Sequence, residues 1–213
     1  MLGWYAGSMA PDTPSQPASR RDELLQLAAT MFADRGLKAT TVRDIADSAG
    51  ILSGSLYHHF KSKEQMVEEV LRDFLDWLFG RYQQILDTAT SPLEKLTGLF
   101  MASFEAIEHR HAQVVIYQDE AKRLSDLPQF DFVETRNKEQ RKMWVDILQE
   151  GVADGSFRPD LDVDLVYRFI RDTTWVSVRW YKPGGPLSAE QVGQQYLAIV
   201  LGGITQSQGD KHA

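Results

Sequence analysis

Apolar residues recur along most of this chain at spacings of three and four, with polar residues between them. That period is typical of amphipathic helices and differs from the strict alternation of half-buried strands. The pattern predicts helices over about residues 20–35, 42–49, 54–60, 63–87, 92–108, 112–124, 130–154, 162–181 and 188–205. We find no strand pattern and no internal repeat, so the expected fold class is all-α.

The stretch over residues 40–66 predicts two short helices joined by a tight turn. Thr41 can cap the first helix, whose apolar positions share one face. Gly50 can adopt the left-handed dihedrals that commonly follow a helix end. Ser53 can cap a second helix over residues 54–60. This arrangement is typical of a helix-turn-helix, whose second helix enters the DNA major groove.

The second of these helices suits contact with DNA. Its outer positions are small or hydrogen-bonding, whereas Leu56 and Phe60 face inward. The two lysines that follow lie at the N-terminus of the next helix, where phosphate is favoured. The residues expected to contact DNA are Thr41, Arg43, Ser53, Gly54, Ser55, Tyr57, His58, Lys61 and Lys63. The alternative is a helical hairpin of a bundle, with no role in DNA binding.

The residues of this region also match a known family in detail. They are AATMF at 28–32, RG at 35–36, TVRDIA at 41–46, AG at 49–50 and GSLYHHFKSKE at 54–64. Over about residues 19–66 the chain resembles the DNA-binding domain of TetR-family transcriptional repressors. The resemblance implies a three-helix DNA-binding domain over residues 19–66, followed by a helical ligand-binding and dimerisation domain over residues 67–213.

The net charge of −7 is unusual for a DNA-binding protein, but the charges are distributed unevenly along the chain. Residues 19–66 carry seven Lys or Arg and six Asp or Glu, a net charge of +1. Residues 67–213 carry sixteen and twenty-three, a net charge of −7. The acidic part is therefore expected to lie away from DNA, and the near-neutral part to make few phosphate contacts.

The remaining composition bears on location and order. Residues 1–18 are rich in Pro, Ser, Ala and Gly and contain no Lys or Arg, so we expect a disordered N-terminal arm. The absence of cysteine fits a reducing compartment, and we expect a cytoplasmic protein. No apolar run approaches the roughly 18–20 residues that span a bilayer, and no secretory signal pattern is present.

The predicted helix over residues 162–181 carries a basic stripe. Arg168, Arg171, Trp175, Arg179 and Lys182 fall within an arc of roughly 80° at 100° per residue. Like charges at this spacing on a helix repel each other, so a row of them is unfavourable unless an anionic group binds beside them. One interpretation is a solvated face paired with acidic neighbours. The other is a ligand site in which guanidinium groups bind phosphate or carboxylate and Trp175 packs on an apolar group, with Arg171 and Trp175 as the leading pair.

A polyanionic ligand with a bulky apolar end, such as an acyl-coenzyme A thioester, fits the second interpretation. The segments FLDW at 74–77, FMASFEAIEH at 100–109 and RDTTWVSVRWY at 171–181 resemble the KstR-type repressors of actinobacterial steroid catabolism, particularly of late ring breakdown. That resemblance implies an acyl-CoA inducer derived from the steroid C and D rings with a propanoate arm. Further pocket candidates are Phe100, Phe104, Gln140 and Trp144, although such aromatic residues are more often plain core.

The sequence offers no nucleophile with a base, no carboxylate pairing and no glycine-rich phosphate loop, so we expect no enzyme, no cofactor and no metal. We expect a repressor that binds a palindromic double-stranded operator as a homodimer through its last two helices. Ligand would shift the base of the long helix over residues 63–87 and change the spacing of the two DNA-binding units. The rivals are a TetR-type repressor with another apolar or anionic inducer, an enzyme acting on an acyl-CoA, and a helical interaction module.

Overall fold

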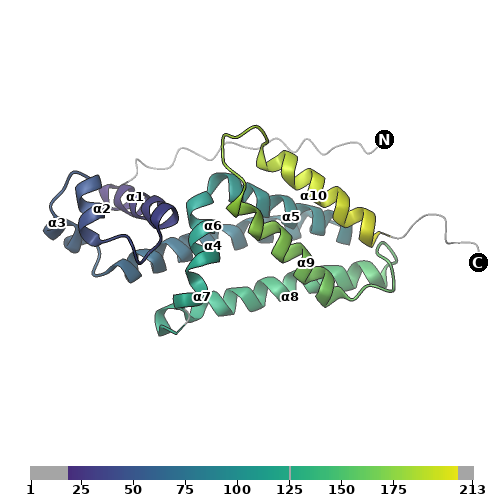
Figure 1. Cartoon of the computed structure of the whole chain (residues 1–213). Coiled ribbons are helices and arrows are strands. Elements are labelled where there is room, and N and C mark those ends of the chain that lie inside the picture. Colours follow the sequence, from purple (N-terminus) through teal and green to yellow (C-terminus); the bar gives the residue numbers. More distant parts are fainter. Residues whose placement is uncertain (1–18, 125, 206–213) are drawn as a thin grey trace, which may run out of the picture.

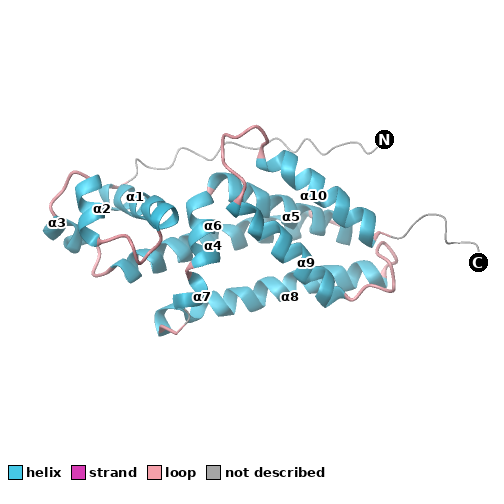
Figure 2. Ribbon diagram, in the orientation of Figure 1, coloured by secondary structure: helices cyan, strands magenta, loops and turns pink. Residues whose placement is uncertain are grey.

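The computed structural model describes residues 19–124 and 126–205, and every named element in this part of the chain is helical (Figure 2). The elements are α1 (Arg20–Arg35), α2 (Val42–Ser48), α3 (Ser53–His59), α4 (Lys63–Thr88), α5 (Pro92–His109), α6 (His111–Asp119), α7 (Ala121–Leu124), η1 (Pro128–Phe130), α8 (Asp131–Ala153), α9 (Val163–Val176), η2 (Ser177–Arg179) and α10 (Ala189–Ile204). The all-α prediction is confirmed. The arm expected over residues 1–18 lies outside the described residues.

The N-terminal unit consists of α1, α2 and α3, which lie together at one end of the molecule (Figure 1). Ser19 caps α1 and Thr41 caps α2, and each forms a reciprocal capping box with an aspartate three residues later. The capping box satisfies two backbone donors that the first turn of a helix leaves unpaired. Gly50 follows α2 with a φ of 67°, which a residue with a Cβ adopts only with strain. The chain therefore turns sharply into α3, as predicted.

The long helix α4 connects the N-terminal unit to the rest of the chain, which we call the body (Figure 1). It has 26 residues and buries an apolar face along most of its length, from Met66 to Tyr82. Because one continuous helix contacts both parts, a movement of its first turns relative to the body also moves the N-terminal unit.

The body is a helical bundle in which α5 lies at the centre. This helix packs against α4, α8, α9 and α10. A Cβ atom added to Gly193 of α10 would lie 3.0 Å from the ring of Phe104, so the small residue lets α10 approach α5 closely. The core is one cluster of buried residues that runs from α1 through to α10.

Contacts with α4 and α6 hold the N-terminal unit against the body. Helix α1 packs on α4 and α6. The Lys63 ammonium at the start of α4 donates to the carbonyl oxygens of Leu37 and Thr40, at 2.8 and 2.7 Å. The backbone N–H of Leu37 donates to the carboxylate of Glu120 at 3.3 Å, across 83 residues of sequence. The loop between α1 and α2 is thus held by α4 on one side and by the end of α6 on the other.

The structure corrects three predicted boundaries. Helix α3 starts at Ser53 itself, with Leu52 as the N-cap residue and no side-chain cap. The helix expected over 112–124 is interrupted at Glu120, between α6 and α7. The helix expected over 162–181 ends at Val176 and tightens into η2, where the Ser177 hydroxyl donates to the carbonyl of Thr174. Such local bonds of serine compete with the helix ladder. No described helix is long and apolar enough to cross a membrane.

Candidate DNA-binding surface and ligand cleft

The outer face of α3 is free for contact with another molecule. Gly54, Ser55, Tyr57 and His58 are exposed, and the Tyr57 side chain stands 55% exposed at the centre of this face. Leu56 and Phe60, on the opposite side, are buried in the core. The inward and outward positions are therefore as predicted. A short helix with small and hydrogen-bonding residues outward can enter the DNA major groove and reach base edges.

The cationic and hydroxyl side chains around α3 differ in whether they are exposed and available to contact DNA. Arg43 is exposed with only a loose pair to Asp47 at 3.7 Å, and Lys61 is exposed. Ser53 is half-buried at the start of α3, and Thr41 is exposed but its hydroxyl is engaged in the cap of α2. Lys63 was expected to contact phosphate; the structure instead commits its ammonium to two backbone carbonyls of the α1–α2 loop.

A cleft of about 680 Å³ opens in the body between α6, α7, α8 and α9. We call it the α8–α9 cleft. Its wall combines apolar and aromatic side chains with charged residues: Tyr117, Gln118, Ala121, Phe130, Asp131, Val133, Glu134, Asn137, Lys138, Gln140, Arg141, Tyr167, Arg171, Asp172, Trp175 and Val176. Small-molecule sites are commonly this large and combine apolar walls with a few polar groups.

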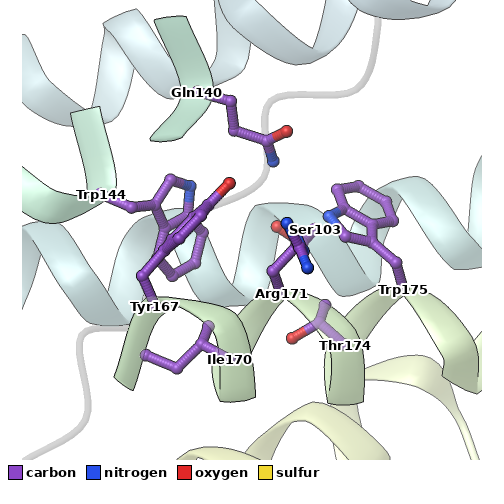
Figure 3. A pocket seen from close by; sticks show the side chains of 8 residues that line it. All are labelled: Ser103, Gln140, Trp144, Tyr167, Ile170, Arg171, Thr174 and Trp175. Carbon is purple, nitrogen blue, oxygen red and sulfur yellow. The ribbon is translucent and has the colours of Figure 1, made fainter. Parts of the chain in front are cut away.

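A small inner cavity of about 10 Å³ extends the cleft toward α5. Gln140, Tyr167, Arg171 and Trp175 line both the cleft and this cavity. Figure 3 shows Gln140 and Trp144 from α8 facing the side chains of α9. The cavity therefore forms the buried end of the cleft.

The aromatic wall of the cleft is tightly packed. Trp175 is only 4% exposed and meets the rings of Phe74 and Tyr117 edge-on, with centroids 6.4 and 6.2 Å apart. The Tyr117 hydroxyl donates to the side-chain oxygen of Asn137, across the cleft from α6 to α8. Burial raises the pKa of both Tyr117 and Tyr167, so both phenols stay neutral at physiological pH. They act as hydrogen-bonding groups within an apolar surface.

The charges at the mouth of the cleft are largely paired. Arg171 contacts Asp172 at 2.7 Å, and this hydrogen bond raises the pKa of Arg171. Lys138 contacts Glu134 at 2.6 Å, and Arg141 pairs with Asp164. All of these side chains are at least partly exposed, so each pair contributes only about 0–1 kcal/mol and can be exchanged for another anion.

Comparison with known proteins matches both halves of the chain to one family. Residues 24–70 match the family described as bacterial regulatory proteins, tetR family, and residues 89–204 match the tetracyclin repressor-like C-terminal domain. The chain belongs to the TetR family. It is 76% identical to the HTH-type transcriptional repressor KstR2 of Mycobacterium tuberculosis over 191 residues, which cover 90% of this chain and 96% of that protein. It is 55% identical to KstR2 of Rhodococcus jostii, over 91% of this chain and 95% of the relative.

Solved structures agree with this assignment. The structure of the ketosteroid transcriptional regulator KstR2 of M. tuberculosis superposes with a TM-score of 0.89, over 90% of this chain and 98% of that one. AibR, solved in complex with isovaleryl coenzyme A and operator DNA, has the same fold, with a TM-score of 0.75 over 84% of this chain and 97% of that one, at 22% identity. The predicted family and the non-enzymatic, transcriptional-repressor class are thus confirmed. TetR-family repressors bind operator DNA and small-molecule ligands, usually as dimers.

The structure brings only part of the predicted ligand set together. Arg171, Trp175 and Gln140 line the α8–α9 cleft, and Trp144 lines its inner cavity. Phe100 and Phe104 are fully buried in α5, where their ring centroids lie 5.4 Å apart at a tilt of 35°, and they line neither space. For these two residues the core interpretation holds, and Tyr196 and Gly193 of α10 pack against Phe104.

The basic stripe does not persist as one surface. Arg168 is exposed and lines neither the cleft nor the inner cavity. Arg179 lies in η2 beyond the end of α9 and pairs with Asp119 at 3.3 Å. Two of the four cations of the stripe, Arg171 and Arg179, therefore form ion pairs with carboxylates of the chain itself. This outcome supports the solvated interpretation for Arg168 and Arg179, and leaves Arg171 as the basic residue of the stripe that the cleft contains.

Several cleft residues were not singled out from the sequence. Tyr117 and Tyr167 look like ordinary apolar-face residues of their helices, and Ser103 and Thr174 look like small core positions. Only the convergence of α5, α6, α8 and α9 brings them to one space. Asn137 is the exception, because the helical period places it on the same face as Gln140 and Trp144 and thereby predicts a polar contact in the cleft.

Large apolar side chains are exposed on the last two helices. On α9 and η2 they are Leu165, Phe169, Val176 and Trp180, and on α10 Ile199, with exposed fractions from 44% to 75%. These side chains lie on or beside the helices that are expected to form the dimer contact, and that contact stays a prediction.

Proposed function

We propose that this chain is a dimeric repressor of a palindromic operator whose inducer is an acyl-CoA thioester with a steroid-derived ring system. One observation carries the inducer: the α8–α9 cleft combines an aromatic inner wall with Arg171, which lines both the cleft and its inner cavity, in a chain 76% identical to KstR2. The volume of about 680 Å³ suits a ring system with a short arm, and the open mouth leaves room for a long polar group outside. AibR provides support that this fold can hold an acyl-CoA.

The orientation of the ligand follows from the cost of burying charge. The phosphates of coenzyme A are strongly hydrated and cannot enter an apolar cavity without losing that hydration. They belong at the mouth, where Arg171, Lys138 and Arg141 can exchange their carboxylate partners for phosphate. The acyl ring system belongs at the inner wall, against Tyr117 and Trp175.

The dimer in this proposal forms through the apolar residues of α9, η2 and α10. Burying Phe169 and Trp180, which are 64% and 51% exposed, against a second copy removes a large apolar area from water. A two-fold dimer presents two α3 helices to the same side of DNA. Two identical helices related in this way read an inverted repeat whose half-sites lie about one helical turn, roughly 34 Å, apart or a multiple of it.

Release of DNA follows from the contacts between the cleft and the N-terminal unit. Tyr117, Gln118 and Ala121 line the cleft from α6 and α7. Glu120, in the same turn, accepts the hydrogen bond from the backbone N–H of Leu37. Ligand that spreads the cleft thereby displaces the α1–α2 loop and the start of α4, which alters the spacing of the two α3 helices. By reciprocity, operator DNA lowers the affinity for the ligand by the same factor.

The test is operator binding followed by fluorescence anisotropy, titrated with steroid-derived acyl-CoA thioesters, free coenzyme A and the free acids. We expect the thioesters alone to release the protein. Arg171→Ala should keep operator binding and require roughly two- to fivefold more thioester, whereas Arg168→Ala, a matched exposed cation outside the cleft, should respond as wild type. Release that is equal in wild type and Arg171→Ala would show that the ligand binds elsewhere.

Trp175 needs a conservative substitution in this test. Because the ring is 4% exposed and packs on Phe74 and Tyr117, Trp175→Ala would leave a cavity and cost about 3–5 kcal/mol of folding free energy. Trp175→Phe keeps an aromatic ring in place and isolates the contribution of the indole to ligand binding.

A further inference from the structure

Leu52, in the turn between α2 and α3, is an apolar side chain that the fold leaves in solvent. It is 79% exposed, more than any other large apolar side chain of the described residues, and it does not pack against the core. Its neighbour Ile51 is half-buried and packs on the core. Ile51 and Leu56 occupy the N′ and N4 positions of α3, where a pair of apolar residues commonly fixes the entry of the chain. The apolar packing of this turn therefore does not need Leu52.

Leu52 also occupies a position at which a polar residue would stabilise the helix. It is the N-cap residue of α3 and forms no side-chain cap. The neighbouring helices α1, α2 and α4 are capped by the side chains of Ser19, Thr41 and Ser62. An N-cap serine accepts a hydrogen bond from a backbone N–H of the first turn, which a leucine cannot do. Neither core packing nor helix capping accounts for a leucine at this position.

The location of Leu52 places it on the surface that is expected to contact DNA. Leu52 and Ser55 are the N-cap and N3 residues of α3, and the capping box shows that these two positions lie side by side on the first turn of a helix. The Ser55 N–H donates to the Leu52 carbonyl at 2.9 Å, and Ser55 is exposed. The first residues of a recognition helix are those that reach base edges in the major groove. Leu52 therefore extends the exposed face of α3 at the end where bases are read.

The chemistry of the side chain restricts its partner on DNA. Leucine neither donates nor accepts a hydrogen bond, so it cannot pair with the amino, carbonyl or ring-nitrogen groups of the major groove. The C5-methyl group of thymine is the apolar group that a base pair presents there. A leucine that packs on this methyl group removes the apolar surface of both from water.

We propose that Leu52 reads a thymine in each operator half-site by packing on the C5-methyl group of the base. This inference rests on the proposed binding of a two-fold operator, because it adds a residue to the same surface. It assigns Leu52 a role in selecting the sequence, alongside the hydrogen-bonding residues of α3. The leucine then favours a thymine over any base that lacks the methyl group at that position.

The experiment uses operator duplexes in which thymines are replaced by deoxyuridine, which lacks only the C5-methyl group. The wild-type protein first selects its operator from random duplexes, and each replacement is made at matching positions of both half-sites. Affinity is measured by anisotropy for wild type, Leu52→Ser and Leu52→Asn. Leu93→Ser, which changes an exposed leucine near the start of α5 in the body, is the matched control. The melting temperatures of both Leu52 variants should equal or exceed that of wild type, since serine and asparagine can cap α3.

We expect one thymine position at which deoxyuridine weakens the binding of wild type about 15-fold, because a buried methyl group contributes roughly fourfold and the dimer contains two. The same replacement should leave the affinities of both Leu52 variants unchanged, whereas Leu93→Ser should respond as wild type. If no selected thymine shows an effect that depends on residue 52, or if no thymine is selected, the contact is overturned while operator binding stands. If wild type selects no sequence at all, the proposed operator binding is wrong and the contact falls with it.

Discussion

The contact between Glu120 and Leu37 provides a direct test of how ligand binding reaches the DNA-binding unit. Glu120 is 6% exposed, stands between α6 and α7, and accepts from the Leu37 N–H at 3.3 Å. Its other partner, Arg123, lies 3.2 Å away but is 46% exposed. The perturbation that separates these contacts is Glu120→Ala, with Glu120→Gln as a variant that keeps an acceptor oxygen.

The magnitude follows from burial. Removing the carboxylate leaves the N–H of Leu37, a residue only 6% exposed, without its partner, which costs about 1–3 kcal/mol. The pair with Arg123 is solvent-screened and adds about 0–1 kcal/mol. Allosteric couplings typically amount to about 1–3 kcal/mol. If this contact carries about 1 kcal/mol of the coupling, the factor by which inducer weakens operator binding falls roughly fivefold in Glu120→Ala.

The assay measures operator affinity with and without saturating inducer, together with ligand affinity with and without operator. Glu120→Ala should bind both partners separately but show a smaller coupling factor in both directions, because coupling is reciprocal. Glu120→Gln should retain most of the coupling. Asp119→Asn, at a neighbouring exposed position that pairs with Arg179, is the control. A folded Glu120→Ala protein with the wild-type coupling factor would refute this route.

Four further outcomes are expected. Tyr57→Ala should weaken operator binding about tenfold or more without changing ligand affinity, and Lys61→Ala should reduce the slope of log K against log salt by about 1, both by anisotropy. Phe169→Lys should convert the dimer to a monomer in light scattering, since a 64% exposed ring on α9 then carries a charge. The Tyr181 hydroxyl and the Ala189 N–H donate hydrogen bonds to Glu108 and lower its pKa from the ordinary value near 4.5. These hydrogen bonds therefore stabilise the fold at pH values above 4.5, and the stabilisation is lost as the pH falls through the lowered pKa of Glu108. The melting-temperature gap between wild type and Glu108→Gln should therefore close only below about pH 4.5.

Local signals explain why much of the fold could be predicted. Helix starts at Ser19 and Thr41 depend on residues three positions apart, and the turn at Gly50 depends on one backbone angle. The outward position of Tyr57 follows from the helical period within a single helix. None of these features needs knowledge of a distant part of the chain.

The candidate ligand cleft could be predicted only in part because it depends on packing between distant helices. A helical wheel places Trp175 beside three arginines and a lysine, but the ring turns into the core between Phe74 and Tyr117. The same helical wheel also places Arg179 on the face of α9. This placement is wrong, because α9 ends at Val176 and the chain continues as the 3₁₀ helix η2. Lys63 shows a different error. The sequence predicts an exposed lysine that is free to contact phosphate, but its ammonium donates to two backbone carbonyls of a loop 23–26 residues away.

The distribution of charge and polarity along the cleft predicts where the proposed acyl-CoA repressor gains its selectivity. Every acyl-CoA carries the same phosphates, and the cations at the mouth already have carboxylate partners, as Arg171 has Asp172. Exchanging one surface pair for another changes the free energy by only about 0–1 kcal/mol, and by the same amount for every thioester. Discrimination must then come from the acyl end. There, an apolar wall alone separates ligands poorly, whereas a buried polar group that needs a partner in the ligand discriminates strongly.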